Sequence, residues 1–250
     1  MLKSRYKIII SYDGTLYAGW QVQKTGVAIQ PCIQKALATI LRTPTDLTGS
    51  GRTDSGVHAL GQVAHFDTNL PIEDPHKFLV SLNALLPPDI QVQELSSVEP
   101  EFHARYKATG KIYHYHLHLD PVTNPFTRLY RAQIFGSFCI KKLQEAIPYF
   151  LGTHDFTAFT HQAHKGTASH DPIRTIERLD VLPEEGGIRL EFEADGFLYK
   201  MVRNIVGTLS DTAQGKMNPD TIPSIFASQD RKQAGSCAPA HGLFLIKVKY

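Results

Sequence analysis

Apolar and polar residues alternate in several short stretches of the chain, and a period of two is typical of strands with one buried face. The alternation is clearest from Tyr6 to Tyr12 and again after Lys111, where tyrosines and leucines share one face and histidines the other. The glycine-rich stretch before Val63 runs into a further short apolar segment. The strands predicted in this way cover residues 6–12, 63–66, 111–119, 188–194 and 243–250.

Between these strands, apolar residues recur at helical spacing. Prolines mark where two of the helices end, because a proline disfavours helical backbone in the residue before it. Pro148 lies inside a third helical pattern and is expected to kink or shorten that helix. The helices predicted in this way cover residues 29–41, 78–86, 143–151 and 201–209.

Strands and helices are interspersed, and the polar alternate positions of the strands favour antiparallel pairing over a parallel sheet buried on both faces. We therefore expect an α+β fold. A proline-rich and polar stretch ends at Pro100, and a boundary soon after it gives two domains of ordinary size. The predicted domains are residues 1–104, which include the glycine-rich loop, and residues 105–250.

Composition narrows the class of protein. The chain has 250 residues, 42% of them hydrophobic and 20% charged, which is typical of a folded globular protein. The apolar run near the N-terminus is too short for a secretory signal, and no run reaches the length of a membrane-spanning helix. We expect a cytoplasmic protein. The formal net charge of +2 does not by itself indicate a nucleic-acid-binding protein.

Cysteines give no sign of a disulfide or a metal site. Cys32, Cys139 and Cys237 are odd in number, far apart and without the paired spacing of a zinc site. Three reduced thiols are the expected state.

Residues 49–58 concentrate reactive side chains among glycines, including Arg52, Asp54 and His58. An ordinary turn, with Asp54 bonded to its own backbone, is one interpretation. The Asp54-Ser55-Gly56 triplet also has the form found in aspartic proteases, but such a site needs two carboxylates and no second triplet occurs. A phosphate-binding loop is disfavoured because neither a Walker sequence nor Gly-x-Gly-x-x-Gly is present.

A longer comparison distinguishes these alternatives. The run from Gly49 to Val63 resembles the signature of the TruA family of tRNA pseudouridine synthases, and further blocks follow in family order to the C-terminus. These blocks are Tyr12-Asp13-Gly14, Tyr17-Ala18-Gly19-Trp20-Gln21, Phe102-His103-Ala104-Arg105-Tyr106, Lys111-Ile112-Tyr113-His114-Tyr115, Gly152-Thr153-His154-Asp155-Phe156, Arg174-Thr175-Ile176, Met201-Val202-Arg203-Asn204-Ile205-Val206-Gly207 and Ala238-Pro239-Ala240-His241-Gly242-Leu243.

The resemblance implies an isomerase that converts uridine to pseudouridine at positions 38, 39 and 40 of the tRNA anticodon stem-loop, without metal or cofactor. It also implies two halves joined in one extended sheet, with Asp54 in the cleft between them, and a homodimer. Breaking the bond from C1′ to N1 and forming one to C5 requires an ionised carboxylate as nucleophile or base. By resemblance, that carboxylate is Asp54.

Three more residues acquire roles from the resemblance. Arg203 is the arginine that pairs with the catalytic aspartate, although its place opposite the apolar stripe of its helix also fits a solvated side chain. Tyr113 is the residue that stacks on the target uracil, with a core tyrosine as the alternative. Arg52 helps to displace the target base, or contacts phosphate.

His114, His116 and His118 share one face of a predicted strand, so a metal-binding site is one interpretation. No acidic or cysteine partner has matching spacing, so a polar strand face is the favoured interpretation. Basic residues nearby are candidates for a tRNA-binding surface, namely Arg105, Lys107, Lys111, Arg128 and Arg131. The competing hypothesis is a tRNA-binding protein that keeps this fold without catalysis.

Overall fold

The structure is a computed structural model that describes residues 4–22, 26–161 and 171–250. The chain divides into two compact units, the first formed by Met1–Thr109 with Phe244–Tyr250 and the second by Gly110–Leu243. This division differs from the predicted domains 1–104 and 105–250 mainly at the C-terminus, because the last strand returns to the first unit.

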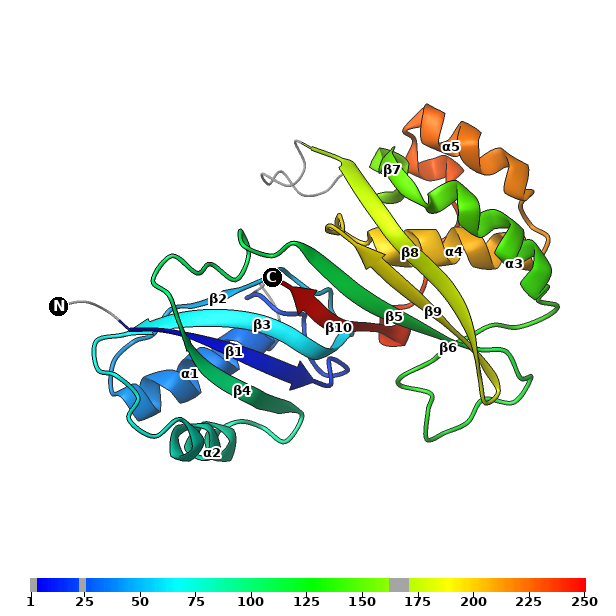
Figure 1. The fold of residues 1–250 in the computed structure, drawn as a ribbon. Helices are drawn as coiled ribbons and strands as arrows, with labels where there is room; N and C mark the ends of the chain where they lie inside the picture. The colour runs from blue at the N-terminus through cyan, green and yellow to red at the C-terminus, as the bar shows by residue number, and fades with distance from the viewer. Residues whose placement is uncertain (1–3, 23–25, 162–170) are drawn as a thin grey trace. The chain divides into compact units, whose positions relative to one another are not determined.

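The first unit is a sheet with two helices beside one another on it (Figure 1). Its strands hydrogen-bond in the order β4-β1-β3-β10, and β2 pairs with β3. The pairs of β1 with β3 and with β4 are antiparallel, and β10 pairs with β3 in parallel through Phe244 and Leu245. The elements are β1 (Ser4–Tyr12), α1 (Ile29–Leu41), β2 (Leu47–Gly49), β3 (His58–Thr68), α2 (Pro75–Leu85), β4 (Ile90–Val98) and β10 (Leu243–Lys249).

The local sequence explains the ends of these helices. In α2, Pro75 occupies the first turn, where a missing N–H costs nothing, and the Asp74 side chain accepts a hydrogen bond of 2.9 Å from the Lys77 N–H. In α1, the apolar stripe that includes Ile29, Ile33 and Leu37 is buried, and the helix ends where Arg42 adopts a left-handed conformation. The predicted boundaries of α1 are confirmed.

The second unit has an antiparallel sheet in the order β5-β9-β8-β7, and the short β6 pairs with β5 in parallel. Figure 1 shows α3, α4 and α5 gathered on one face of β8 and β9. The elements are β5 (Gly110–His118), β6 (Ala132–Gln133), α3 (Ile140–Ala146), β7 (Gly152–Asp155), β8 (Ile173–Glu184), β9 (Gly187–Ala194), α4 (Met201–Ala213) and α5 (Ile222–Ser228).

Pro148 shortens α3 as predicted. The α-helix ends at Ala146, and Ile147–Phe150 continues as a tighter 3₁₀ turn. A proline lacks the N–H that an α-helical interior requires, so the regular helix stops before it.

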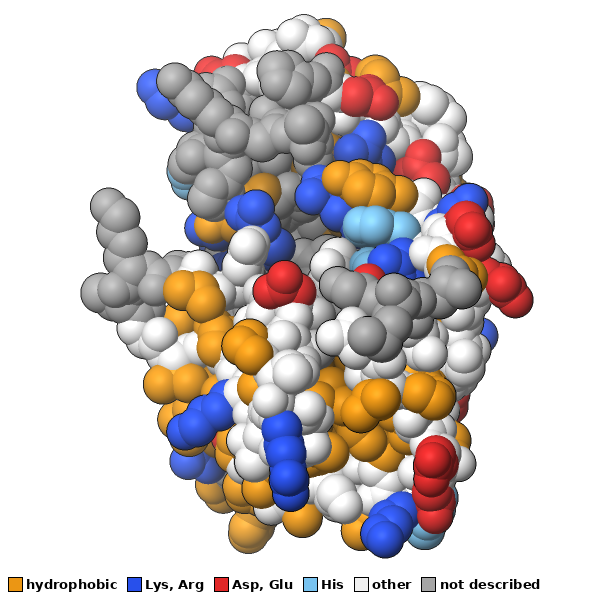
Figure 2. All heavy atoms as spheres, turned by 90° about the vertical axis from the view of Figure 1, so that its left-hand side faces the viewer, with side chains coloured by type: hydrophobic (Ala, Val, Ile, Leu, Met, Phe, Trp, Pro, Cys, Tyr) orange, Lys and Arg blue, Asp and Glu red, His pale blue; other side chains and the backbone are white. Residues whose placement is uncertain are grey.

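The α+β class with mainly antiparallel strands is confirmed in both units. Figure 2 shows that positive and negative side chains are interspersed on the face it presents, in keeping with the small net charge. Within the described parts of the chain, no helix combines the length and apolar character needed to cross a bilayer.

Candidate active site

The loop between β2 and β3 is anchored first by a buried glutamine. Ser50 donates from its backbone N–H to the Val63 carbonyl and from its hydroxyl to Gln62 Oε1, both at 2.7 Å. The Gln62 amide donates in turn to the Gly51 carbonyl at 3.1 Å. Gln62 is fully buried, so losing these bonds would leave polar atoms unsatisfied. The first half of the loop is therefore fixed to β3.

A second brace comes from the end of β1 and the segment after it. The Tyr12 hydroxyl lies 2.8 Å from Thr53 Oγ1, and the backbone N–H of Trp20 donates to the Thr53 carbonyl at 3.2 Å. Both aromatic side chains are buried. Burial raises the pKa of the Tyr12 hydroxyl, so this contact remains a neutral hydrogen bond. Thr53, the residue before Asp54, is held on both its side chain and its backbone.

Two glycines allow this close approach. A Cβ added at Gly14 would lie 2.0 Å from the Val57 carbonyl oxygen. Gly19 has a φ of +97°, and a Cβ there would lie 2.5 Å from the Thr53 carbonyl oxygen. Neither distance is compatible with a side chain. The two motifs before α1 thus form a backbone cradle for the loop.

Asp54 lies at the bend of the loop and is half-buried. The Val57 N–H donates to the Asp54 carbonyl at 3.2 Å, and the Ser55 hydroxyl donates to the Tyr17 carbonyl at 3.1 Å. Gly56 closes the bend with a φ of +78°. Arg52 lies on the same loop and is exposed. The backbone on both sides of Asp54 is fixed, which sets the direction in which its side chain leaves the loop.

Tyr113 lies on β5 in the second unit. Its side chain is only 7% exposed, and the Phe197 ring meets it edge to face with centroids 5.1 Å apart. Its register partner on β9 is Phe192. The edge-to-face contact with Phe197 limits how the Tyr113 ring can turn, which suits a stacking surface.

Arg203 lies on α4, whose side chains are almost all buried. Its Nε donates to the Ala238 carbonyl at 2.8 Å, and the Ala238 N–H donates back to the Arg203 carbonyl at 3.0 Å. A Cβ at Gly207 would lie 1.5 Å from the Ser236 carbonyl oxygen, so the segment packs directly against the helix backbone. The hydrogen bond from Nε to the Ala238 carbonyl therefore orients the Arg203 guanidinium.

The structure thus places Asp54 and Arg52 on one loop of the first unit, and Tyr113 and Arg203 in the second unit. A family model for tRNA pseudouridine synthase matches residues 8–107 and 146–250, which together cover most of the chain and include Asp54, Arg52 and Arg203. The chain belongs to the tRNA pseudouridine synthase family.

Curated relatives of this family match over nearly the whole chain. One from Protochlamydia amoebophila, named tRNA pseudouridine synthase A 1, is 53% identical and covers 98% of this chain and 96% of its own length. A tRNA pseudouridine synthase A from Acetivibrio thermocellus is 43% identical and covers 98% of both chains. A relative from Bacillus cereus is 42% identical, again over 98% of both chains. The sequence-based predictions of the family and of an isomerase are confirmed.

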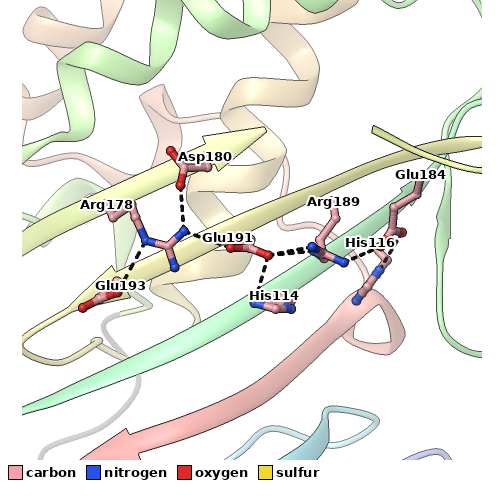
Figure 3. A network of polar contacts seen from close by, with 8 residues as sticks. All are labelled: His114, His116, Arg178, Asp180, Glu184, Arg189, Glu191 and Glu193. Atoms are coloured by element: carbon pink, nitrogen blue, oxygen red, sulfur yellow. Dashed lines mark hydrogen bonds and ion pairs between the residues drawn. The ribbon is translucent and has the colours of Figure 1, made fainter. Parts of the chain in front are cut away.

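The histidine face of this pseudouridine synthase is a network of polar contacts (Figure 3). His114 Nε2 lies 3.3 Å from Glu191 Oε1, and His116 Nδ1 lies 2.9 Å from Glu184 Oε2. Two arginines belong to this network, with Arg189 between the two glutamates and Arg178 bonded to Glu191 at 2.9 Å. Among the described residues, no group of His, Cys, Asp or Glu is placed to hold a metal ion.

The third histidine and the two arginines predicted nearby lie in different surroundings. His118 is buried rather than part of the polar face, and its Nε2 donates to the Val122 carbonyl at 2.9 Å. Arg131 pairs with Glu184 at 3.4 Å and therefore extends the network. Arg128 is exposed.

The residues that hold the loop of Asp54 in place were visible in the sequence only as parts of the matching blocks. Tyr12, Gly14, Gly19 and Gln62 received no role there because each acts through a partner more than ten residues away. Gly14 and Gly19 did offer a signal of close backbone packing, because each stands in a short motif with aromatic residues and far from any predicted hairpin.

Proposed function

We propose that this enzyme converts uridines 38, 39 and 40 in the anticodon stem-loop of tRNA to pseudouridine, with Asp54 as the catalytic carboxylate. Family membership supports the reaction class. The observation that carries the assignment of Asp54 is the bracing of its loop, in which the preceding Thr53 is bonded on side chain and backbone. Such preorganisation is expected where a carboxylate must meet one atom of a bound nucleoside.

The reaction rearranges one nucleotide and balances without a co-substrate. The bond between C1′ and N1 breaks, a bond between C1′ and C5 forms, C5 loses its proton and N1 gains one. An ionised carboxylate at Asp54 is suited to attack C1′, to add to C6 of uracil, or to remove a sugar proton. All three routes require the target base to leave its stack, at a cost of a few kcal/mol.

The other proposed residues divide the remaining tasks. Arg203 pairs with the Asp54 carboxylate, and its bond to Ala238 supports this role by restricting the guanidinium to one direction. Tyr113 stacks on the extruded uracil, for which its braced, planar ring is suited. Arg52, exposed on the catalytic loop, displaces the base or holds the adjacent phosphate.

The assembly proposed from the family resemblance is a cytoplasmic homodimer. Sedimentation of the purified protein measures the oligomeric state directly. A monomer at micromolar concentration that still modifies tRNA would overturn the dimer without affecting the catalytic assignment.

The decisive experiment compares wild type with Asp54→Asn on unmodified tRNA transcript, with pseudouridine mapped along the anticodon arm. Asp54→Asn keeps the shape of the side chain but removes the charge, so we expect no detectable conversion and tRNA affinity within about threefold of wild type. Asp46→Asn, at an exposed position just before β2, is the matched control and should retain full activity.

The outcomes separate the hypotheses. Conversion by Asp54→Asn at the wild-type rate would show that another group carries the chemistry. Wild type that binds the transcript but never converts it would instead favour the tRNA-binding protein without catalysis.

A further inference from the structure

The loop between β5 and β6 differs in charge from the rest of the chain. From residue 121 to residue 144 the sequence contains Arg128, Arg131, Lys141 and Lys142 and no aspartate or glutamate. Over the whole chain, acidic and basic residues are nearly equal in number, 24 against 26. This stretch also lies outside the two segments matched by the family model. The family match therefore assigns no role to this stretch.

Residues 121–131, here called the Phe126 loop, have a defined structure of their own. The Asn124 side chain accepts from the Phe126 N–H at 2.9 Å, and the Asn124 carbonyl accepts from the Thr127 N–H at 3.2 Å. At the base, Thr123 bonds to Gln133 at 2.9 Å and the Val122 carbonyl is held by His118. Figure 1 shows this segment in green, extending past the hairpin of β8 and β9.

This ordered loop presents an apolar ring to solvent. Phe126 is 89% exposed, the highest value among the exposed large hydrophobic side chains of the described residues, and Val122 is 78% exposed. A single exposed apolar side chain is unremarkable on a protein surface. Two exposed apolar side chains on a loop that is fixed by its own hydrogen bonds are less usual. The loop has already lost its conformational entropy, yet neither side chain is buried in exchange.

The neighbouring charge favours RNA as the partner. Arg128 is exposed and donates to the Pro125 carbonyl, which keeps its guanidinium on the same turn as the Phe126 ring. An aromatic ring beside an arginine, with no acidic residue from 121 to 131, fits a nucleobase with its phosphate. Stacking on an aromatic side chain is worth about 1–3 kcal/mol per base and tolerates any base.

We propose that the Phe126 loop is a second contact of this enzyme with its RNA substrate, in which Phe126 stacks on an unpaired nucleobase and Arg128 contacts a phosphate. The inference rests on the proposed function only in taking tRNA as the substrate. It adds a binding residue that acts on substrate affinity and not on the chemical step.

The test measures the Kd for unmodified tRNA transcript together with KM and kcat for wild type, Phe126→Ala and Phe126→Trp. We expect Phe126→Ala to raise Kd and KM about 5- to 100-fold, with kcat at saturating tRNA unchanged. Phe126→Trp should restore the affinity, because its ring also stacks. Arg128→Gln should weaken the salt dependence of binding by about one unit of slope.

Phe135→Ala is the matched control. Phe135 is 71% exposed but lies beyond β6, outside the Phe126 loop, so the same substitution there should leave Kd unchanged. Equal Kd for wild type and Phe126→Ala would overturn the proposal, as would equal losses in the two alanine variants. A change in sedimentation of Phe126→Ala with unaltered tRNA affinity would show a contact between protein copies, which also overturns it.

The test separates this inference from the catalytic assignment. If Asp54→Asn remained active while Phe126→Ala lost affinity, the proposed function of Asp54 would fail and the Phe126 contact would stand. If Asp54→Asn were inactive and Phe126→Ala bound normally, only the Phe126 contact would fail.

Discussion

Two strands of this enzyme, β3 and β5, both carry histidines and use them differently. On β3, His58 and His65 are buried and accept hydrogen bonds from the backbone N–H groups of Gly14 at 3.0 Å and of Ala104 at 3.2 Å, and His58 also lies 3.1 Å from the Asp13 carboxylate. On β5, His114 and His116 are half-buried and lie 3.3 Å and 2.9 Å from the carboxylates of Glu191 on β9 and Glu184 on β8. The first pair of histidines fixes loops, and the second satisfies charges on a sheet face.

The difference teaches that residue type alone does not reveal a site. The histidine-rich pattern of β5 raised the possibility of a metal site in the sequence, whereas Gln62 and His65 of β3 suggested no role there. Yet β3 follows the loop of Asp54, and its Gln62 anchors that loop. Polar groups buried among apolar neighbours carry more structural consequence than polar groups on a half-exposed face.

The largest effect is expected from filling the cradle beside β3. Gly14→Ala places a methyl group against the Val57 carbonyl, so the loop must shift. A shift of about 1 Å costs about 100-fold in kcat, and the strain costs about 1–3 kcal/mol of stability. Single-turnover kinetics and thermal unfolding measure the two effects.

Gly196→Ala is the control for this substitution. The nearest atom to a Cβ at Gly196 is Arg174 Nε at 3.5 Å, an ordinary contact, and this glycine does not have a positive φ. Its activity should match wild type. If Gly14→Ala had full activity as well, the rigid cradle would not matter for catalysis.

A smaller effect is expected in the pH dependence of stability. Burial, with the charges of Arg5 and His103, lowers the pKa of His65 from 6.5 to about 4. The unfolded chain therefore takes up this proton below pH 6.5 while the folded chain does not. The resulting stability is fully present above pH 6.5 and is lost as pH falls toward 4.

The measurement is Tm from pH 7 to pH 4 for His65→Gln and His114→Gln. Removing His65 should make Tm fall less steeply as the pH is lowered. Removing His114 should do so less, because burial lowers the pKa of His114 but Glu191 opposes the shift. Equal slopes in the two variants would contradict the contrast between β3 and β5.

The smallest effect is expected from the network on β5, β8 and β9. Burial alone would raise the pKa of Glu191, but the bond from Arg178 and the charges of His114 and Arg189 outweigh it and lower the pKa. This carboxylate therefore stabilises the fold above its ordinary pKa and ceases to do so as pH falls below it.

Glu191→Gln at pH 7 should cost about 0.5–1 kcal/mol, because Arg178 is partly exposed and keeps its bond to Asp180. Chemical denaturation measures the loss, and kcat should not change. A loss as large as that of Gly14→Ala would place this face among the elements that support the active site.

Local pattern was enough for the regular elements with strong periodicity. The helix Ile29–Leu41 and the strand Gly187–Ala194 follow from apolar spacing within each segment, and Pro148 predicts the break after Ala146. The strands β4, β7 and β8 were not predicted, because long-range pairing, and not local alternation, defines them. β3 also proved longer than its predicted core of Val63–Phe66, since its ends pair with β1.

The candidate residues could be named from the sequence, but their supports could not. Asp54, Arg52, Tyr113 and Arg203 stand in short motifs that resemble those of the family, which is why the sequence alone was enough to propose them. The bonds that orient them join positions such as Tyr12 with Thr53, and Arg203 with Ala238, which are 41 and 35 residues apart. No short pattern encodes such a separation.

The sequence by itself determined the family, the reaction class and the local preference of most elements, because motifs and periodicity are written within a few consecutive residues. The tertiary structure alone decided that the C-terminal strand joins the first unit, through parallel pairing of Phe244 with His58. It alone also showed that Gly14 and Gly19 touch the loop of Asp54. These contacts depend on chain closure over long distances, where packing and backbone hydrogen bonds, and not local propensity, select the partner.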